Sequence, residues 1–194
     1  MTASYRDVLD FWFPPEDAPD FNEAKQNWFS KDSAFDTEII ERFGPTYEAA
    51  VAGTLDSWLD TAEGTLALIL VLDQFPRNMF RESEKAFAAD AQARQVAHHA
   101  VEKGFDKDTL WTNEHRIFFY LPFEHSEELD DQALCLKLVE DIPGAMDDQG
   151  YHFWALAHYR IIETFGRFPH RNKALGRDNT IEETAFLLQP NSGF

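Results

Sequence analysis

The stretch LALILVLDQFPRN, residues 66–78, decides the fold class of this chain. Its apolar run 66–72 could form a buried β-strand, but the flanking residues extend it beyond the length of an ordinary strand. No other segment alternates between apolar and polar residues over a useful length, as a half-buried strand would. Because proline disfavours helical geometry in the residue before it, a helix is expected to end at Phe75. The sequence therefore predicts an all-α fold.

The same pattern, an apolar helix that meets a proline, recurs along the chain at Phe13-Pro14, Leu121-Pro122 and Phe168-Pro169. Successive prolines at 76, 122 and 169 leave room in each interval for one amphipathic helix and one buried helix. This spacing predicts stacked helical hairpins, an α-solenoid-like or tetratricopeptide-like arrangement, in one domain over residues 1–194. The alternative is a compact, irregular helical domain.

Helix boundaries are marked by three local signals. Ser4 to Asp7 and Thr180 to Glu183 have the spacing of a capping box, in which two side chains bond reciprocally to the first turn. Residues 83–103 are Ala-rich and free of Pro and Gly, and they predict one helix that ends at Gly104.

Composition and charge exclude several classes of protein. The 194 residues are 44% hydrophobic and 27% charged, which is typical of a globular chain. The net charge of -18 repels phosphate groups, so neither nucleic acid nor an anionic membrane surface is expected as a partner. The N-terminus lacks a basic then apolar leader, and the apolar run 66–72 is too short to cross a bilayer, so a cytoplasmic location is expected. The chain has a single cysteine, Cys135, which excludes an internal disulfide. We expect Cys135 to be a thiol in the core.

Polar side chains follow three of the predicted helix ends, in the segments 72–78, 121–127 and 166–172. Equivalent ends of stacked hairpins lie on one side, so these groups are expected to converge. His158, on the apolar face of a helix predicted over 151–167, joins the candidates, although a lone histidine there is more often a core residue. The candidate ligand-binding residues are Asp73, Arg77, Asn78, Glu124, His125, Glu127, His158, Arg167, His170, Arg171 and Asn172.

A purely structural interpretation uses the same donors. Arg77, Arg167 and Arg171 could cap the last carbonyls of their helices, and Asn78 and Asn172 could form ordinary turns. Two details favour a site instead. Asp73 follows an apolar run near the negative end of a helix and requires a cationic partner, for which Arg77 is the candidate. Residues 158–177 also carry a net charge of +4 within this acidic chain.

Familiar catalytic signatures are absent from the sequence, including a phosphate-binding glycine loop, GxSxG and HExxH. The sequence Glu124-His125-Ser126-Glu127 offers metal-ligand types, but neighbouring residues in a loop indicate a metal site only weakly. No metal and no cofactor is predicted.

Together, the motifs Asp10-Phe11-Trp12-Phe13, Trp28-Phe29, 72–78, 121–127 and 166–172 resemble those of a bacterial family known as domain of unknown function 924. The resemblance runs from Asp10 to Phe194. It implies a fold similar to tetratricopeptide-like helical arrays, and it implies no activity, substrate or cofactor.

The leading functional prediction is a cytoplasmic protein that binds a small anion, such as a carboxylate or phosphate, or the acidic end of a peptide. Arginine suits such ligands because its guanidinium forms paired hydrogen bonds. The first alternative is a hydrolase or transferase in which His125 or His170 is the acid/base and Glu124 or Glu127 is its partner. The second alternative is a scaffold that binds proteins through its outer helical surface. The sequence does not choose an oligomeric state.

Overall fold

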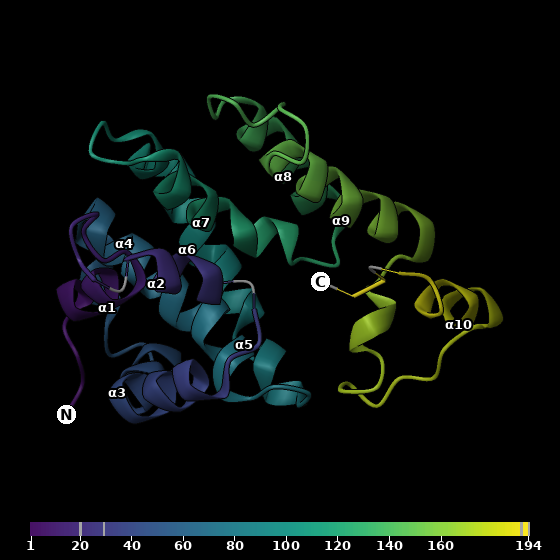
Figure 1. Ribbon diagram of the computed structural model, residues 1–194, viewed down its shortest axis with the longest axis horizontal. Coiled ribbons are helices and arrows are strands. Elements are labelled where there is room, and N and C mark those ends of the chain that lie inside the picture. Colours follow the sequence, from purple (N-terminus) through teal and green to yellow (C-terminus); the bar gives the residue numbers. More distant parts are fainter. Residues whose placement is uncertain (20, 29, 191, 194) are drawn as a thin grey trace. The chain divides into compact units, whose positions relative to one another are not determined.

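The computed structural model describes residues 1–19, 21–28, 30–190 and 192–193, and over these residues it is helical without any strand (Figure 1). The prediction of an all-α fold is therefore confirmed. The α-helices are α1 Tyr5–Trp12, α2 Phe21–Asn27, α3 Ser33–Val51, α4 Ala62–Ile69, α5 Phe75–Met79, α6 Asp90–Lys103, α7 Asn113–Glu124, α8 Leu129–Glu140, α9 Tyr151–Phe165 and α10 Ile181–Leu187. A π-helical segment, Leu70–Gln74, joins α4 to α5, and short 3-10 turns cover Asp56–Asp60, Glu84–Phe87, Phe105–Lys107 and Pro169–Arg171.

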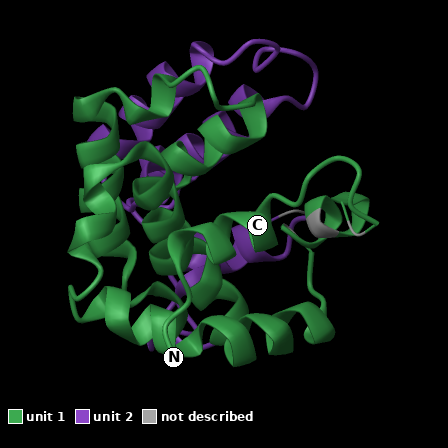
Figure 2. Cartoon of the chain, turned by 90° about the vertical axis from the view of Figure 1, so that its left-hand side faces the viewer, with its two compact units in different colours: residues 1–81, 85–122 green, residues 82–84, 123–194 purple. Residues whose placement is uncertain are grey.

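The chain forms two compact units (Figure 2). Unit 1 contains residues 1–81 and 85–122, and unit 2 contains residues 82–84 and 123–194. The single domain over residues 1–194 and the tetratricopeptide-like stacking stay predictions. In the described part of the chain, no helix is both long enough and apolar enough to cross a membrane.

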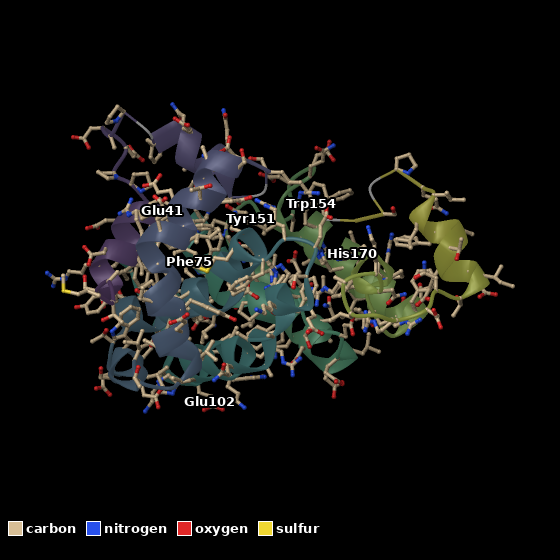
Figure 3. The ribbon with its side chains drawn as sticks, turned by 90° about the horizontal axis from the view of Figure 1, so that it is seen from below. Glu41, Phe75, Glu102, Tyr151, Trp154 and His170 are labelled. Atoms are coloured by element: carbon tan, nitrogen blue, oxygen red, sulfur yellow. The ribbon has the colours of Figure 1, made fainter. Side chains whose placement is uncertain are left out.

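The core of unit 1 is built around the apolar run that opens the sequence analysis. Residues 66–72 are all buried, because α4 and the π-helical segment pack against α1, α3 and α6. A helix covered on every side needs no polar face, which explains the missing periodicity of this run. Phe75 is fully buried among these helices, whereas Glu41 and Glu102 lie on the exposed faces of α3 and α6 (Figure 3).

Two of the four helix ends predicted from proline are wrong. The backbone stays helical through Phe75, whose N–H donates to the carbonyl of Leu70 as the wider π turn closes. Pro76 therefore falls in the first turn of α5, where a missing N–H costs little. Helix α7 likewise continues through Pro122 and ends two residues later at Glu124, so that proline affects only the last turn.

The other two predicted ends lie close to their prolines. Helix α1 ends at Trp12, immediately before Phe13-Pro14, as predicted. Helix α9 ends at Phe165 because Gly166 adopts the left-handed conformation with φ of 68°, and Pro169 begins a separate 3-10 turn. The glycine, and not the proline, therefore ends α9.

Both predicted capping boxes are confirmed, at Ser4 with Asp7 and at Thr180 with Glu183. Gly104 ends α6 with φ of 71°, also as predicted. The predicted start of that helix at residue 83 is wrong, because residues 84–87 form a separate 3-10 turn and α6 begins at Asp90. Glu82, with a left-handed φ of 60°, turns the chain just before this 3-10 segment.

Candidate functional site

In unit 1, Asp73 and Arg77 form the ion pair that the sequence predicts. Arg77 Nη1 lies 3.3 Å from Asp73 Oδ1 and 3.0 Å from Asp90 Oδ1, and Asp73 is fully buried. Burial alone would lower the pKa of Arg77, but the charges of the two aspartates outweigh it and raise the pKa. Arg77 also donates to the backbone carbonyl of Asp73, as a capping residue does. Its donors are therefore engaged inside unit 1.

Asn78 also has partners within unit 1. Its side-chain amide donates to Asp36 Oδ1 on α3 over 2.9 Å. Arg81 holds the same carboxylate with Nε and Nη2, at 2.5 and 2.7 Å. Sequence analysis missed Arg81 and Asp36, because no local pattern connects residues 45 positions apart.

In unit 2, several candidates gather around the buried ring of Phe168. The Arg171 guanidinium carbon lies 4.5 Å from the ring centroid, and the His158 and His170 rings lie 5.7 and 5.5 Å away. His125 reaches the group through His158, with 6.3 Å between their ring centroids. We call this group the Phe168 cluster, and its members are Glu124, His125, His158, Phe168, His170 and Arg171.

Helix geometry fixes the central histidine of the cluster. His158 lies on α9, and its Nδ1 is 2.9 Å from the carbonyl oxygen of Trp154 one turn earlier. The same Nδ1 is 3.1 Å from Oε1 of Glu124, at the end of α7. Because a carbonyl oxygen only accepts, Nδ1 carries the proton and Nε2 carries the lone pair.

His158 is neutral at physiological pH. Its pKa is lowered to about 3, mainly by burial. The hydrogen bond to the Trp154 carbonyl raises the pKa but only partly offsets this effect. The positive charges of His125, Arg171 and His170 lower the pKa of His158 further. Its contact with Glu124 is therefore not an ion pair but the approach of a carboxylate to a neutral imidazole.

Access to the cluster is uneven. Glu124, His158 and Arg171 are each no more than 6% exposed, and Phe168 is fully buried. His125 and His170 are partly exposed, and His170 projects from the 3-10 turn Pro169–Arg171 (Figure 3). The two imidazoles are therefore the solvent-exposed part of the cluster.

Glu127 supports the cluster from the loop between α7 and α8. Its Oε1 accepts the backbone N–H of Phe168 over 2.9 Å, and Arg177 holds both carboxylate oxygens at 2.8 and 2.9 Å. Burial would raise the pKa of Glu127, but these hydrogen bonds outweigh it and lower the pKa. Glu127 is thus an anchor for Phe168.

Arg167 and Asn172 belong to a second polar network in unit 2. Arg167 Nε lies 2.6 Å from Oε1 of Glu183, the residue that closes the capping box of α10. The amide of Asn172 donates to Asn179 and accepts from Arg177 Nε, at 2.8 and 2.9 Å. Both candidates therefore hold the chain that leads into α10.

The cysteine behaves as a core residue. Cys135 is buried on α8, and burial raises the pKa of its thiol, with the Glu124 charge as a further cause. Such a thiol is a poor nucleophile at neutral pH. Across the described residues, no three His, Cys, Asp or Glu side chains are arranged to hold a metal ion.

Sequence analysis found five of the six members of the Phe168 cluster but quoted the phenylalanine only as a helix end. The sequence signal that could have identified Phe168 as a member is an aromatic residue directly before Pro-His-Arg, because its ring can stack against both of the basic side chains that follow.

Comparisons with known proteins identify relatives over nearly the whole chain. The sequence profile of a family described as "Bacterial protein of unknown function (DUF924)" matches residues 8–191. A solved structure, described as a protein of unknown function, ATU0120, from Agrobacterium tumefaciens, is 39% identical, with a TM-score of 0.84 over 96% of this chain and 97% of that one. A comparison with curated proteins found no match.

Proposed function

The chain belongs to the DUF924 family of bacterial proteins of unknown function, so its own side chains must indicate what it does, and we propose that it binds a small anion at the Phe168 cluster. The observation that carries the proposal is the gathering of His158, His170 and Arg171 around the buried ring of Phe168, with His125 beside His158. A carboxylate, a phosphate or the acidic end of a peptide is the ligand class.

Arg171 is the central residue of this proposal. Its guanidinium lies over the Phe168 ring and is buried, so a bound anion would meet it away from bulk water, where charge-assisted hydrogen bonds are strong. The other candidate arginines, Arg77 and Arg167, lie outside the Phe168 cluster and pair with aspartate and glutamate. Arg171 is therefore the arginine whose substitution tests binding at the cluster.

The test is calorimetric titration of the full chain with phosphate and with succinate at constant ionic strength. Saturable binding is expected, and Arg171→Ala and Arg171→Lys should weaken it, since lysine keeps the charge but loses the paired hydrogen bonds. The matched control is Arg160→Ala, which removes one exposed arginine from α9 of the same unit. Equal binding by Arg171→Ala and Arg160→Ala would contradict the proposal.

Thermal stability gives a second readout. A ligand that binds only the folded state adds about 2.7 kcal/mol at a hundred times its dissociation constant. Salts of matched ionic strength are required, because screening alone stabilises a chain of net charge -18. A shift that does not saturate would indicate screening only.

An enzyme that uses the same cluster is the second candidate, because the Trp154 carbonyl holds the Nδ1 proton of His158, with Glu124 close by, and leaves Nε2 as an acceptor. A pKa of about 3 makes His158 a weak base, which favours binding over proton transfer. Screens of esters, phosphates and amides test this function. If the parent chain turns over one of these substrates and His158→Gln, His125→Ala or His170→Ala abolishes that turnover, the protein is an enzyme and the binding proposal is wrong.

A further inference from the structure

A cavity in unit 1 is lined by none of the candidate ligand-binding residues. It has a volume of about 200 Å³ and lies between the end of α1, helix α2 and the start of α7. Aromatic rings and two prolines form most of its wall, and a lysine, two glutamates, a threonine and a histidine complete it. Pockets for drug-sized ligands are larger, so a ligand here would be small.

The aromatic wall is held in place before any ligand binds. The indole N–H of Trp28 donates to the carbonyl of Trp12 over 2.9 Å, and its ring packs edge-on against Phe13 with 5.5 Å between centroids. The His115 ring lies 4.1 Å from Phe13, and its Nδ1 is 2.7 Å from the hydroxyl of Thr112. Burial lowers the pKa of His115, which is therefore neutral at physiological pH.

A cation already lies against this wall. The ammonium of Lys25 is 4.6 Å from the centroid of the Phe21 ring and 2.9 Å from Oε1 of Glu114. The ring face and the carboxylate therefore form a seat that matches a positive charge on two sides. The side chains of Lys25 and Glu114 are 35% and 36% exposed, so solvent reaches both members of the ion pair.

The charges around the cavity favour a cation over an anion. Its charged lining consists of Lys25, Glu16 and Glu114, which gives a net charge of one negative unit with His115 neutral. When Lys25 turns away, the wall that remains is aromatic and acidic. The whole chain adds an attractive field through its net charge of -18.

We propose that this cavity binds a small organic cation, an ammonium group with apolar substituents, which takes the place of the Lys25 ammonium between Phe21 and Glu114. Lys25 then acts as an internal competitor for the seat. The site lies entirely within unit 1 and does not depend on anion binding at the Phe168 cluster.

The test compares choline with 3,3-dimethylbutan-1-ol, its uncharged isostere, in titrations of the full chain followed by tryptophan fluorescence and calorimetry. Choline should bind saturably and about tenfold more tightly than the alcohol, because only the cation gains from the ring faces and the carboxylate. Equal affinity for both probes would overturn the proposal and indicate an apolar pocket without charge preference.

Two variants and their matched controls test the seat itself. Glu114→Gln should weaken choline binding by about tenfold, whereas Glu102→Gln on the exposed face of α6 should leave it unchanged. Lys25→Met should strengthen binding because it removes the competitor, whereas the exposed Lys31→Met should have no effect.

Weaker binding by Lys25→Met, or equal losses in Glu114→Gln and Glu102→Gln, would overturn the proposal, as would the absence of choline binding to both the parent chain and Lys25→Met. Phenylpropionate serves as the anionic probe, and tighter binding of phenylpropionate than of choline would also overturn it. Far-UV circular dichroism checks that each variant is folded.

Discussion

Arg177 and Glu127, 50 residues apart in the chain, meet in a two-pronged ion pair with N–O distances of 2.8 and 2.9 Å. Arg177 Nη2 also donates to the carbonyl of Phe168, whose N–H donates to Glu127. The pair therefore holds both backbone groups of Phe168 and fixes the ring on which the cluster is built.

The first prediction concerns this pair. Glu127→Gln and Arg177→Met should each lower the free energy of unfolding by about 1–3 kcal/mol, because each leaves a partly buried charge without its partner. Urea denaturation of both single variants and the double variant measures the coupling. Additive losses would show that the two side chains act independently, and Arg160→Met is the matched control for charge removal.

The second prediction concerns the buried carboxylate of unit 1. Asp73→Asn should lower the free energy of unfolding by about 3–5 kcal/mol, because the substitution removes the buried carboxylate that pairs with Arg77. Denaturation in urea measures the loss, and the exposed Asp60→Asn is the control. An unchanged transition midpoint in Asp73→Asn would mean that Asp90 alone is sufficient for Arg77.

The third prediction concerns acid stability. Hydrogen bonds from Arg167 and from the Thr180 backbone N–H lower the pKa of Glu183 from 4.5 to about 2. A lowered pKa means that this stabilisation is complete above pH 4.5 and is lost as pH falls toward 2. The melting temperature should therefore fall in that range, and by less in Glu183→Gln. Glu182→Gln, on the exposed face of α10, should behave like the parent.

The fourth prediction concerns His158, whose pKa is lowered from 6.5 to about 3 in the folded chain. Between these values the unfolded chain binds a proton that the folded chain does not, so stability falls as pH falls below 6.5. The slope should approach about 1.4 kcal/mol per pH unit for one proton.

His158→Gln should remove that slope, while His98→Gln, at an exposed position of α6, should keep it. Unfolding free energies from urea titrations at several pH values provide the measurement. If the unfolding free energy of the parent chain depends on pH no more steeply than that of His158→Gln, the His158 imidazole is readily protonated in the folded chain.

Local sequence signals predicted those features that depend on neighbouring residues. The capping boxes at Ser4 and Thr180, the end of α6 at Gly104 and the contact of Asp73 with Arg77 each span a few positions. The prediction that each proline ends a helix was too general. Pro76 occupies the first turn of α5 and Pro122 the last turn of α7, where helices tolerate proline.

The candidate site was predictable in its residue types but not in its partners. Whether an arginine is available for a ligand depends on the acids that reach it from elsewhere in the chain. Asp90 engages Arg77 and Glu183 engages Arg167, at separations of 13 and 16 residues. These contacts follow from packing, which the spacing of polar residues does not reveal.

The π-helical segment Leu70–Gln74 also has a consequence for chain length. A π turn accommodates one residue more than an α turn, and each helical residue rotates the chain by about 100°. Deletion of one residue here would restore a regular helix and swing Arg77 away from Asp90 and Asn78 away from Asp36. The segment should therefore tolerate a changed side chain more readily than a changed number of residues.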